Sequence, residues 1–417
     1  MKETYLDNHS NTRLDERVYK EILPYLDEIY ANAQSSHSLG LKSKEAIEKA
    51  REQAAGLIGA QASEIHFTSN ASEANNLAIK GIAEAQKHKG KHIIVSGIEH
   101  FSVLNSAKRL GLSGFKITHI PVDKHGLISP EHVKKEIKED TILISIQHGN
   151  PEIGTVQPIE EISKIAKDKK ILFHVDAVCT VGLVPVNAAD LGVDLMTFSS
   201  SQMYGPKGTA ALYVKKGVRI IPLIDGGIQE HGRRAGTENV PSIVGFGKAC
   251  EIAKAEMNDN LKKITGLRDK LITELPKKIE HIYLTGHPQK RLPNNVSFLV
   301  EFVEGESMFL FLDQKGIYIT SGSSCASKSL KLSHVLSATQ ADTALGQGSL
   351  LMTLSKYNNE EDIERIITEL PMIVKKLRDM SPLYAYFLKT GQRRVAGPGA
   401  DYDHDHEHEH EDKELFN

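Results

Sequence analysis

The chain has 417 residues, of which 40% are hydrophobic and 25% charged, and 51 basic residues nearly balance 54 acidic ones. A formal net charge of −3 excludes a strongly basic surface, so nucleic acid is not an expected partner. No run of 18 apolar residues occurs, and the polar start lacks a secretory pattern, so we expect a cytoplasmic protein without membrane contact. Three scattered cysteines are too few for a disulfide framework or a four-thiolate zinc site.

Strand-like and helix-like segments alternate along the first two thirds of the chain. Short apolar runs predict buried strands within residues 92–100, 141–149, 171–178 and 194–200. Amphipathic stretches such as residues 72–89 and 159–170 predict helices between them. This alternation favours an α/β fold with a mainly parallel sheet flanked by helices. Because chemistry in such sheets gathers at the carboxyl ends of the strands, attention falls on Glu99–His100, Gly149–Glu152, Asp176–Cys179 and Ser199–Gln202.

The composition changes after about residue 255. A charged helical stretch leads into a smaller α+β region with a strand at 294–303, a Gly- and Ser-rich loop at 320–330 and a helix at 360–380. We expect a large domain over residues 16–258 and a small domain made of residues 1–15 and 259–390. Residues 391–417, rich in His and acidic residues, are expected to be a disordered tail.

The densest cluster of small polar residues lies at 67–81. A predicted strand ends at Thr68, and Ala71 and Ser72 precede a helix expected to start near Glu73. Free N–H groups and the positive end of the helix dipole make such a place an anion site, suited to phosphate. Alternatively, Ser72 only caps the helix.

Three single residues also suggest chemistry. Asp176 ends a buried strand, where it either caps the next segment or holds a protonated ring nitrogen of a cofactor. His100 either stacks on a flat ring or makes a polar contact in the core. Cys325 lies in a polar loop and is expected to be a reactive or ligating thiol, whereas Cys250 lies in a helix and is expected to be buried.

These clusters in this order resemble the cysteine desulfurases, the class V branch of the pyridoxal-phosphate (PLP) aminotransferase fold. The resemblance runs from about Tyr5 to Tyr384. The segments that carry it are TSNASEANNLAIKG, GIEHFSVLN, PEIGTVQPIEEI, HVDAV, SSQMYGPKGTAALYV, GRRAGTENVPSIVGFGKA, RLPNNVSF, VEGESM, SGSSCASKSL and MSPLY.

The resemblance implies a PLP-dependent transferase-like fold of type I, with a seven-stranded sheet in the large domain and a homodimeric assembly. Such enzymes take sulfur from free cysteine, hold it as a persulfide on a loop cysteine, and pass it to an iron–sulfur scaffold protein or another acceptor. The position that matches this cysteine is Cys325.

The sequence departs from the family pattern at several pocket positions. Gln202 stands where the family has the lysine that binds the cofactor, and Ser201 stands where a histidine precedes it. Lys207 matches a second family lysine beyond the Gly-Pro turn. Because an amide nitrogen cannot form a Schiff base, we expect no covalently bound PLP.

Further departures affect the substrate side of the pocket. Leu351 replaces the arginine that binds the substrate carboxylate, Pro151 replaces an asparagine, and Cys179 replaces a polar cofactor contact. Cys179 is expected to pack into the pocket, with a second functional thiol as the alternative. The vestigial cofactor pocket is then expected to comprise Ala71, Ser72, His100, Asp176, Cys179, Ser199, Ser201, Gln202 and Thr237.

The tail carries alternating histidines and acids, with His404, His406, His408 and His410 as candidate ligands for nickel or zinc. The alternative is an acidic tail that is merely solvated.

Taken together, these features predict a divergent desulfurase-like protein of iron–sulfur cluster assembly, inactive as a classical desulfurase. It would offer Cys325 to a scaffold protein as a persulfide carrier or as a ligand of a shared iron–sulfur cluster. The first alternative is a genuine PLP-dependent cysteine desulfurase with an atypical site. The second is a non-enzymatic metal-handling protein that uses the tail.

Overall fold

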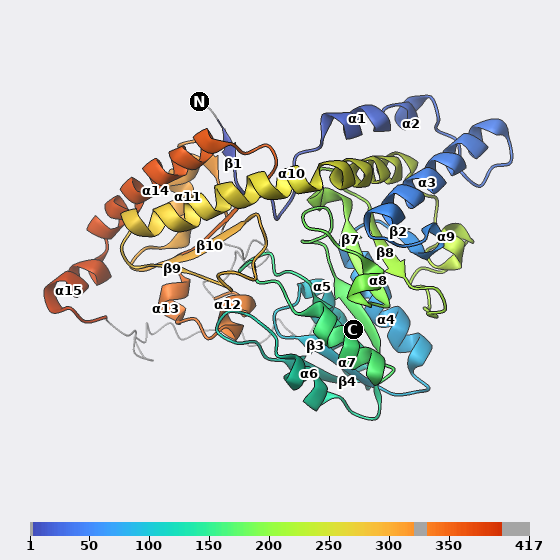
Figure 1. The fold of residues 1–417 in the computed structure, drawn as a ribbon, viewed down its shortest axis with the longest axis horizontal. Helices are drawn as coiled ribbons and strands as arrows, with labels where there is room; N and C mark the ends of the chain where they lie inside the picture. The colour runs from blue at the N-terminus through green and yellow to red at the C-terminus, as the bar shows by residue number, and fades with distance from the viewer. Residues whose placement is uncertain (1–2, 321–331, 394–417) are drawn as a thin grey trace, which may run out of the picture.

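The computed structural model describes residues 3–320 and 332–393. Its centre is a seven-stranded sheet with the strand order β2-β8-β7-β6-β5-β3-β4 (Figure 1). β8 is antiparallel to both of its neighbours, and the remaining pairings are parallel. The bounds are β2 Ile65–Thr68, β3 His92–Ser96, β4 Lys116–Ile120, β5 Thr141–Gln147, β6 Leu172–Asp176, β7 Leu195–Ser199 and β8 Ala210–Val214. The predicted α/β fold is confirmed, and the four predicted apolar runs form β3, β5, β6 and β7.

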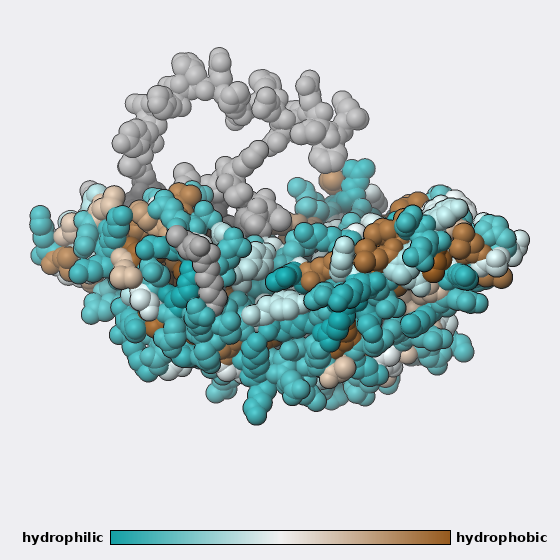
Figure 2. All heavy atoms as spheres, turned by 90° about the horizontal axis from the view of Figure 1, so that it is seen from above, coloured by the Kyte–Doolittle hydropathy of each residue, from teal (hydrophilic) through white to brown (hydrophobic). Residues whose placement is uncertain are grey.

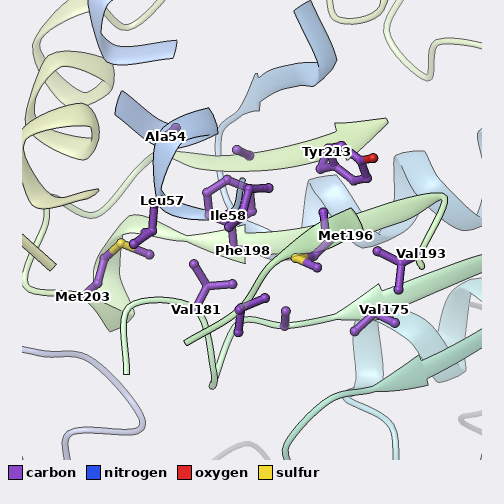
Figure 3. Packing of buried hydrophobic residues seen from close by; sticks show 14 of the residues in the cluster. Ala54, Leu57, Ile58, Val175, Val181, Val193, Met196, Phe198, Met203 and Tyr213 are labelled. Carbon is purple, nitrogen blue, oxygen red and sulfur yellow. The ribbon is translucent and has the colours of Figure 1, made fainter. Parts of the chain in front are cut away.

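Helices cover both faces of this sheet because its strands are apolar on both faces. In β3, Ile94 packs into the same core as α3, α7 and the first half of α10, whereas Ile93 and Val95 pack against α4 and α5. Figure 3 shows part of the first core, where Ile58 and Phe198 lie among labelled apolar side chains. The helices are α3 Ser38–Leu57, α4 Ala71–Gln86, α5 Phe101–Leu112, α6 Pro130–Glu136, α7 Ile159–Asp168 and α8 Ala188–Leu191.

One long helix, α10 (Val240–Lys278), joins the large sheet to the second part of the molecule (Figure 1). Its first half buries Val244, Phe246 and Cys250 in the large core, and its second half buries Leu267 and Leu271 in a separate core. The charged helical stretch and the segment around Cys250, both expected to be helical, belong to this one helix, which begins at Val240. The predicted boundary at residue 258 falls inside this helix, and the domain limits stay a prediction.

The second core lies on a three-stranded antiparallel sheet of β9 Ile282–Leu284, β10 Asn295–Val300 and β12 Ser349–Thr353. The N-terminal strand β1 (Thr4–Tyr5) pairs with β11 (Ile317–Tyr318), which brings the start of the chain to this part. The helices here are α11 Gly305–Asp313, α12 His334–Ala338, α13 Thr343–Gly346, α14 Glu360–Asp379 and α15 Pro382–Thr390. The remaining short elements are α1 Glu16–Ile22, α2 Pro24–Asp27, η1 Ala62–Glu64, η2 Ser200–Gln202 and α9 Gln229–Gly232.

Within residues 3–320 and 332–393, no helix combines the length and the apolar character needed to cross a bilayer. No group of three or more His, Cys, Asp or Glu side chains there is arranged to hold a metal ion.

Candidate active site

Asp176 ends β6 at the carboxyl edge of the sheet and is buried. Its Oδ2 accepts a hydrogen bond from Asn75 Nδ2 at 2.7 Å, and its Oδ1 accepts one from the Val178 N–H at 3.1 Å. Burial raises the pKa of the Asp176 carboxyl, while the nearby His100 and the hydrogen bonds from Asn75 and Val178 act in the opposite direction. Within the described ranges, no lysine or arginine forms an ion pair with it. A buried carboxylate of this kind is suited to a cationic ring nitrogen from a bound group.

His100 lies next to Asp176 through a chain of polar contacts. It caps α5, and its Nδ1 contacts Ser102 Oγ at 2.7 Å. Asn75 Nδ2 donates to the same Ser102 Oγ at 2.9 Å as well as to Asp176. Asn75 Oδ1 is buried without a hydrogen-bond partner. Asn75 was not among the residues predicted from the sequence, although a polar residue among the apolar residues of α4 is a signal of such a role.

The N-terminus of α4 lies at the end of β2, as expected, but its cap differs from the prediction. The helix begins at Ala71, and Asn70 caps it by accepting a hydrogen bond from the Glu73 N–H at 2.9 Å. The interpretation of Ser72 as the cap is therefore wrong, because the extended backbone is at Asn70 and Ser72 already lies in the first helical turn. The N–H groups of Ala71 and Ser72, in the first turn, have no acceptor within the helix and are therefore available to donate to an anion, as predicted for this place.

Ser199 ends β7, and Ser201 and Gln202 lie in the short turn η2 that follows it. The hydroxyl oxygens of Ser199 and Ser201 lie 3.2 Å apart, so both belong to one polar patch. The Gln202 amide donates to the backbone carbonyls of His9 at 2.9 Å and Ser10 at 3.4 Å. Lys207 lies beyond this turn and is exposed.

A cavity of about 30 Å³ lies beside Gln202. Three of its lining residues, Pro151, Cys179 and Gln202, are positions where the sequence departs from the family pattern. The cavity holds about two water molecules, so it accommodates a small group rather than a whole cofactor. Cys179 is partly buried, and burial together with the Asp176 charge raises the pKa of its thiol. The other lining residues are Asn8, His9, Thr12, Val178, Val181, Gly182, Leu183, Tyr204, Leu292, Asn294, Thr353 and Leu354.

Some predicted residues lie away from this cluster or outside the described residues. Thr237 is exposed and lines a different cavity, with Thr68 and Ser69. Leu351 is buried in β12. Cys250 is buried as predicted, and burial raises the pKa of its thiol. Cys325 and the candidate metal ligands His404, His406, His408 and His410 fall outside the described residues, so the loop-thiol, cluster and tail-metal predictions have no structural test.

Comparison with known proteins gives a consistent result. Residues 4–366 match the Aminotransferase class-V family. The chain is 49% identical over 381 residues to "Cysteine desulfurase IscS" of Dictyoglomus turgidum, covering 91% of this chain and 97% of that protein. It is also 49% identical over 382 residues to the protein of the same name from Methanosarcina thermophila, covering 92% and 94%. A solved structure titled "NIFS-LIKE PROTEIN" superposes with a TM-score of 0.85 at 38% identity, covering 90% of this chain and all of that one.

These comparisons correct the cofactor prediction. Cysteine desulfurases of the IscS type depend on PLP, and relatives sharing about half of their residues with this chain carry that name. The expectation that covalently bound PLP is absent is therefore wrong, and the comparisons do not support a degenerate site or a pseudoenzyme. The prediction was drawn from several changed pocket positions, Gln202, Ser201 and Leu351 among them, and these did not outweigh the similarity of the whole chain to IscS-type relatives.

Proposed function

The chain belongs to the class-V aminotransferases, in the cysteine desulfurase family, and on this basis we propose that it is a genuine PLP-dependent cysteine desulfurase with an atypical site. It supplies sulfur for iron–sulfur cluster assembly. The single observation that carries the proposal is Asp176, a buried carboxylate at the end of β6 without a lysine or arginine partner in the described part of the chain. A protonated pyridine nitrogen supplies the missing cation.

The other residues of the site fit the remaining parts of the cofactor. The first turn of α4, at Ala71 and Ser72, and the hydroxyls of Ser199 and Ser201 provide donors for a phosphate group. His100, next to Asp176, provides a flat ring against the cofactor. When bound, PLP withdraws electrons from the substrate so that its carbon–sulfur bond can break. The site is atypical at Gln202, whose amide nitrogen is held by two backbone carbonyls.

Cys325 is the proposed sulfur acceptor. Its thiolate attacks the sulfur of L-cysteine, the carbon–sulfur bond of the substrate breaks, and a proton replaces the sulfur on the substrate carbon. The products are L-alanine and a persulfide on Cys325, so atoms and electrons balance without an added oxidant. The persulfide then passes to an acceptor such as an iron–sulfur scaffold protein. We propose that the working form is a homodimer.

The test combines cofactor retention with product formation. Purified protein is incubated with PLP, gel-filtered, and assayed for retained cofactor; L-alanine and sulfide released from L-cysteine are then measured in the presence of a thiol reductant. We expect retained cofactor and both products from the wild type, little retention in Asp176→Asn, and no sulfide from Cys325→Ser. Gln202→Lys should retain more cofactor than the wild type.

The matched control is Asp190→Asn in α8, which removes an exposed carboxylate that is not part of the site. Wild-type protein that retains no cofactor, or an Asp176→Asn variant that retains as much as Asp190→Asn, would contradict the proposal.

A further inference from the structure

His9 lies between the two parts of the molecule, next to the cavity at Gln202. Its N–H donates to Thr353 Oγ1 at 2.9 Å, at the end of β12. Its carbonyl accepts the hydrogen bond from Gln202 Nε2. These two backbone contacts fix where the imidazole is held, and the ring belongs to the lining of the cavity.

Only one nitrogen of the His9 ring is occupied. Nδ1 lies 3.1 Å from Asp7 Oδ1 and at the 3.5 Å limit from Thr353 Oγ1. Asp7 Oδ1 also accepts from Ser10 Oγ at 2.8 Å, which holds the carboxylate in place. Asp7 Oδ1 therefore lies within ion-pair distance on the Nδ1 side of the ring, and Nε2 is left without a hydrogen-bond partner in residues 3–320 and 332–393. The His9 side chain is 12% exposed, so the ring is largely shielded from bulk solvent.

The rest of the lining determines what this nitrogen can recognise. Among the lining residues that the structure describes, none is Lys, Arg, Asp or Glu, so His9 is the one described side chain there that can carry a positive charge. Asn294, across the lining, has its Oδ1 buried without a hydrogen-bond partner. Buried polar atoms without partners are uncommon, and each calls for a ligand or a bound water. The substrate class of the proposed reaction, an amino acid, brings a carboxylate that needs a charged donor.

We propose that His9, as the imidazolium, recognises the carboxylate of the amino-acid substrate, with its Nε2–H donating to a carboxylate oxygen, while Asn294 Oδ1 accepts a hydrogen bond from the amino group of the same substrate. The inference rests on the proposed function, because it takes the cavity at Gln202 as the substrate side of the site. Asp7 positions the imidazolium by ion pairing on its Nδ1 side. Leu351, which is buried in β12, has no charged group with which to bind the substrate carboxylate.

The first test uses binding without turnover. Protein labelled with ¹⁵N in its histidine rings is titrated with L-alanine, which keeps the carboxylate and lacks sulfur, and with ethylamine, which lacks the carboxylate. We expect the His9 ring resonances, assigned by their loss in His9→Gln, to shift with L-alanine and to stay in place with ethylamine. Equal shifts with both compounds, or none with L-alanine, would overturn the inference.

The second test separates this inference from the proposed function. In steady-state turnover of L-cysteine, His9→Gln should raise KM about tenfold or more with a smaller effect on kcat, and His9→Arg should restore KM because it keeps a charged donor. His88→Gln, at an exposed position after α4, is the matched control. Turnover with an unchanged KM in His9→Gln would overturn the role of His9 and leave the proposed function standing. If the protein does not turn over L-cysteine but the His9 ring resonances still shift only with compounds that carry a carboxylate, the role of His9 stands and the proposed function is overturned.

Discussion

Glu152 is a buried acid close to the candidate site, in the segment that follows β5. Its side chain is buried, and its Oε1 accepts a hydrogen bond from Ser333 Oγ, just before α12. Burial raises the pKa of the Glu152 carboxyl to about 7, although the hydrogen bond from Ser333 acts in the opposite direction. The folded protein therefore keeps a proton on this group over a range in which the unfolded chain has lost it.

This difference predicts how the free energy of unfolding depends on pH. Between the ordinary glutamate pKa of 4.5 and the folded value of about 7, the native state binds the extra proton, so stability falls as pH rises. The slope from this group approaches about 1.4 kcal/mol per pH unit and levels off above the folded pKa. Glu152→Gln keeps an acceptor for Ser333 and removes the titration. We expect the free energy of unfolding of Glu152→Gln, relative to that of the wild type, to increase by about 3 kcal/mol from pH 5 to pH 8.

Urea unfolding followed across that pH range measures the effect. Other buried groups titrate in both proteins, so the informative quantity is the difference between the two stability curves. Glu139→Gln, at an exposed position before β5, is the control and should run parallel to the wild type. Parallel curves for Glu152→Gln would show that this carboxyl is not protonated in the folded protein near neutral pH.

At the residue scale, the sequence predicted the side chains that follow strands and missed those placed by distant segments. Asp176 and His100 were found because each follows a recognisable strand. His9 was missed because its position depends on Thr353, 344 residues away in the chain, and on Gln202. Gln202, Ser201 and Leu351 were recognised as departures, but these substitutions together were not sufficient to predict the loss of the cofactor.

At the level of elements, α10 shows how tertiary packing accounts for residues that oppose local helix propensity. The segment VGFGKA in its first half is rich in glycine, which is unfavourable in helices, yet it lies within the helix. Gly247 lies where α3 packs closely on α10, whereas a Cβ at Gly245 would meet Ile22 of α1. A Cβ at Gly247 would lie 2.5 Å from Ala50 Cα and 2.6 Å from Ala50 Cβ. Tertiary packing, which the sequence pattern does not contain, therefore overrides helix propensity at this position.

Two glycines of α10 allow a matched test of this explanation. Gly247→Ala places a methyl group against the backbone of α3, and we expect a loss of about 2 kcal/mol in the free energy of unfolding. Gly266→Ala, in the second half of the same helix, meets no atom within 4 Å, and we expect a gain of about 1 kcal/mol from helix propensity. Chemical denaturation of both variants gives the two values. Stabilisation by both alanines would show that α3 and α10 are not closely packed.

At the scale of the whole molecule, two segments next to the seven-stranded sheet carry strongly exposed apolar side chains. One is the α1–α2 region, where Leu26 is 61% exposed, and the other is the loop before α9, where Ile228 is 80% exposed. Figure 2 shows apolar side chains gathered on the side of the molecule that carries α1 and α2. A hydrogen bond of 2.8 Å from Gln34 to Glu238 links the chain after α2 to the chain after α9. Exposed apolar groups of this kind are typical of interaction surfaces, and the proposed homodimer provides the occupant.

The dimer proposal predicts which surface substitutions separate the subunits. In a two-fold symmetric interface each residue occurs twice, so Leu26→Asp or Ile228→Asp buries two charges for one change. We expect each variant to weaken dimerisation about 100-fold or more, measured by sedimentation equilibrium over a range of concentrations. The control is Leu388→Asp on α15, a residue that is 66% exposed at the opposite end of the molecule (Figure 1). It should leave the association unchanged. Dissociation by Leu388→Asp, with intact dimers of both other variants, would place the interface on α15 instead.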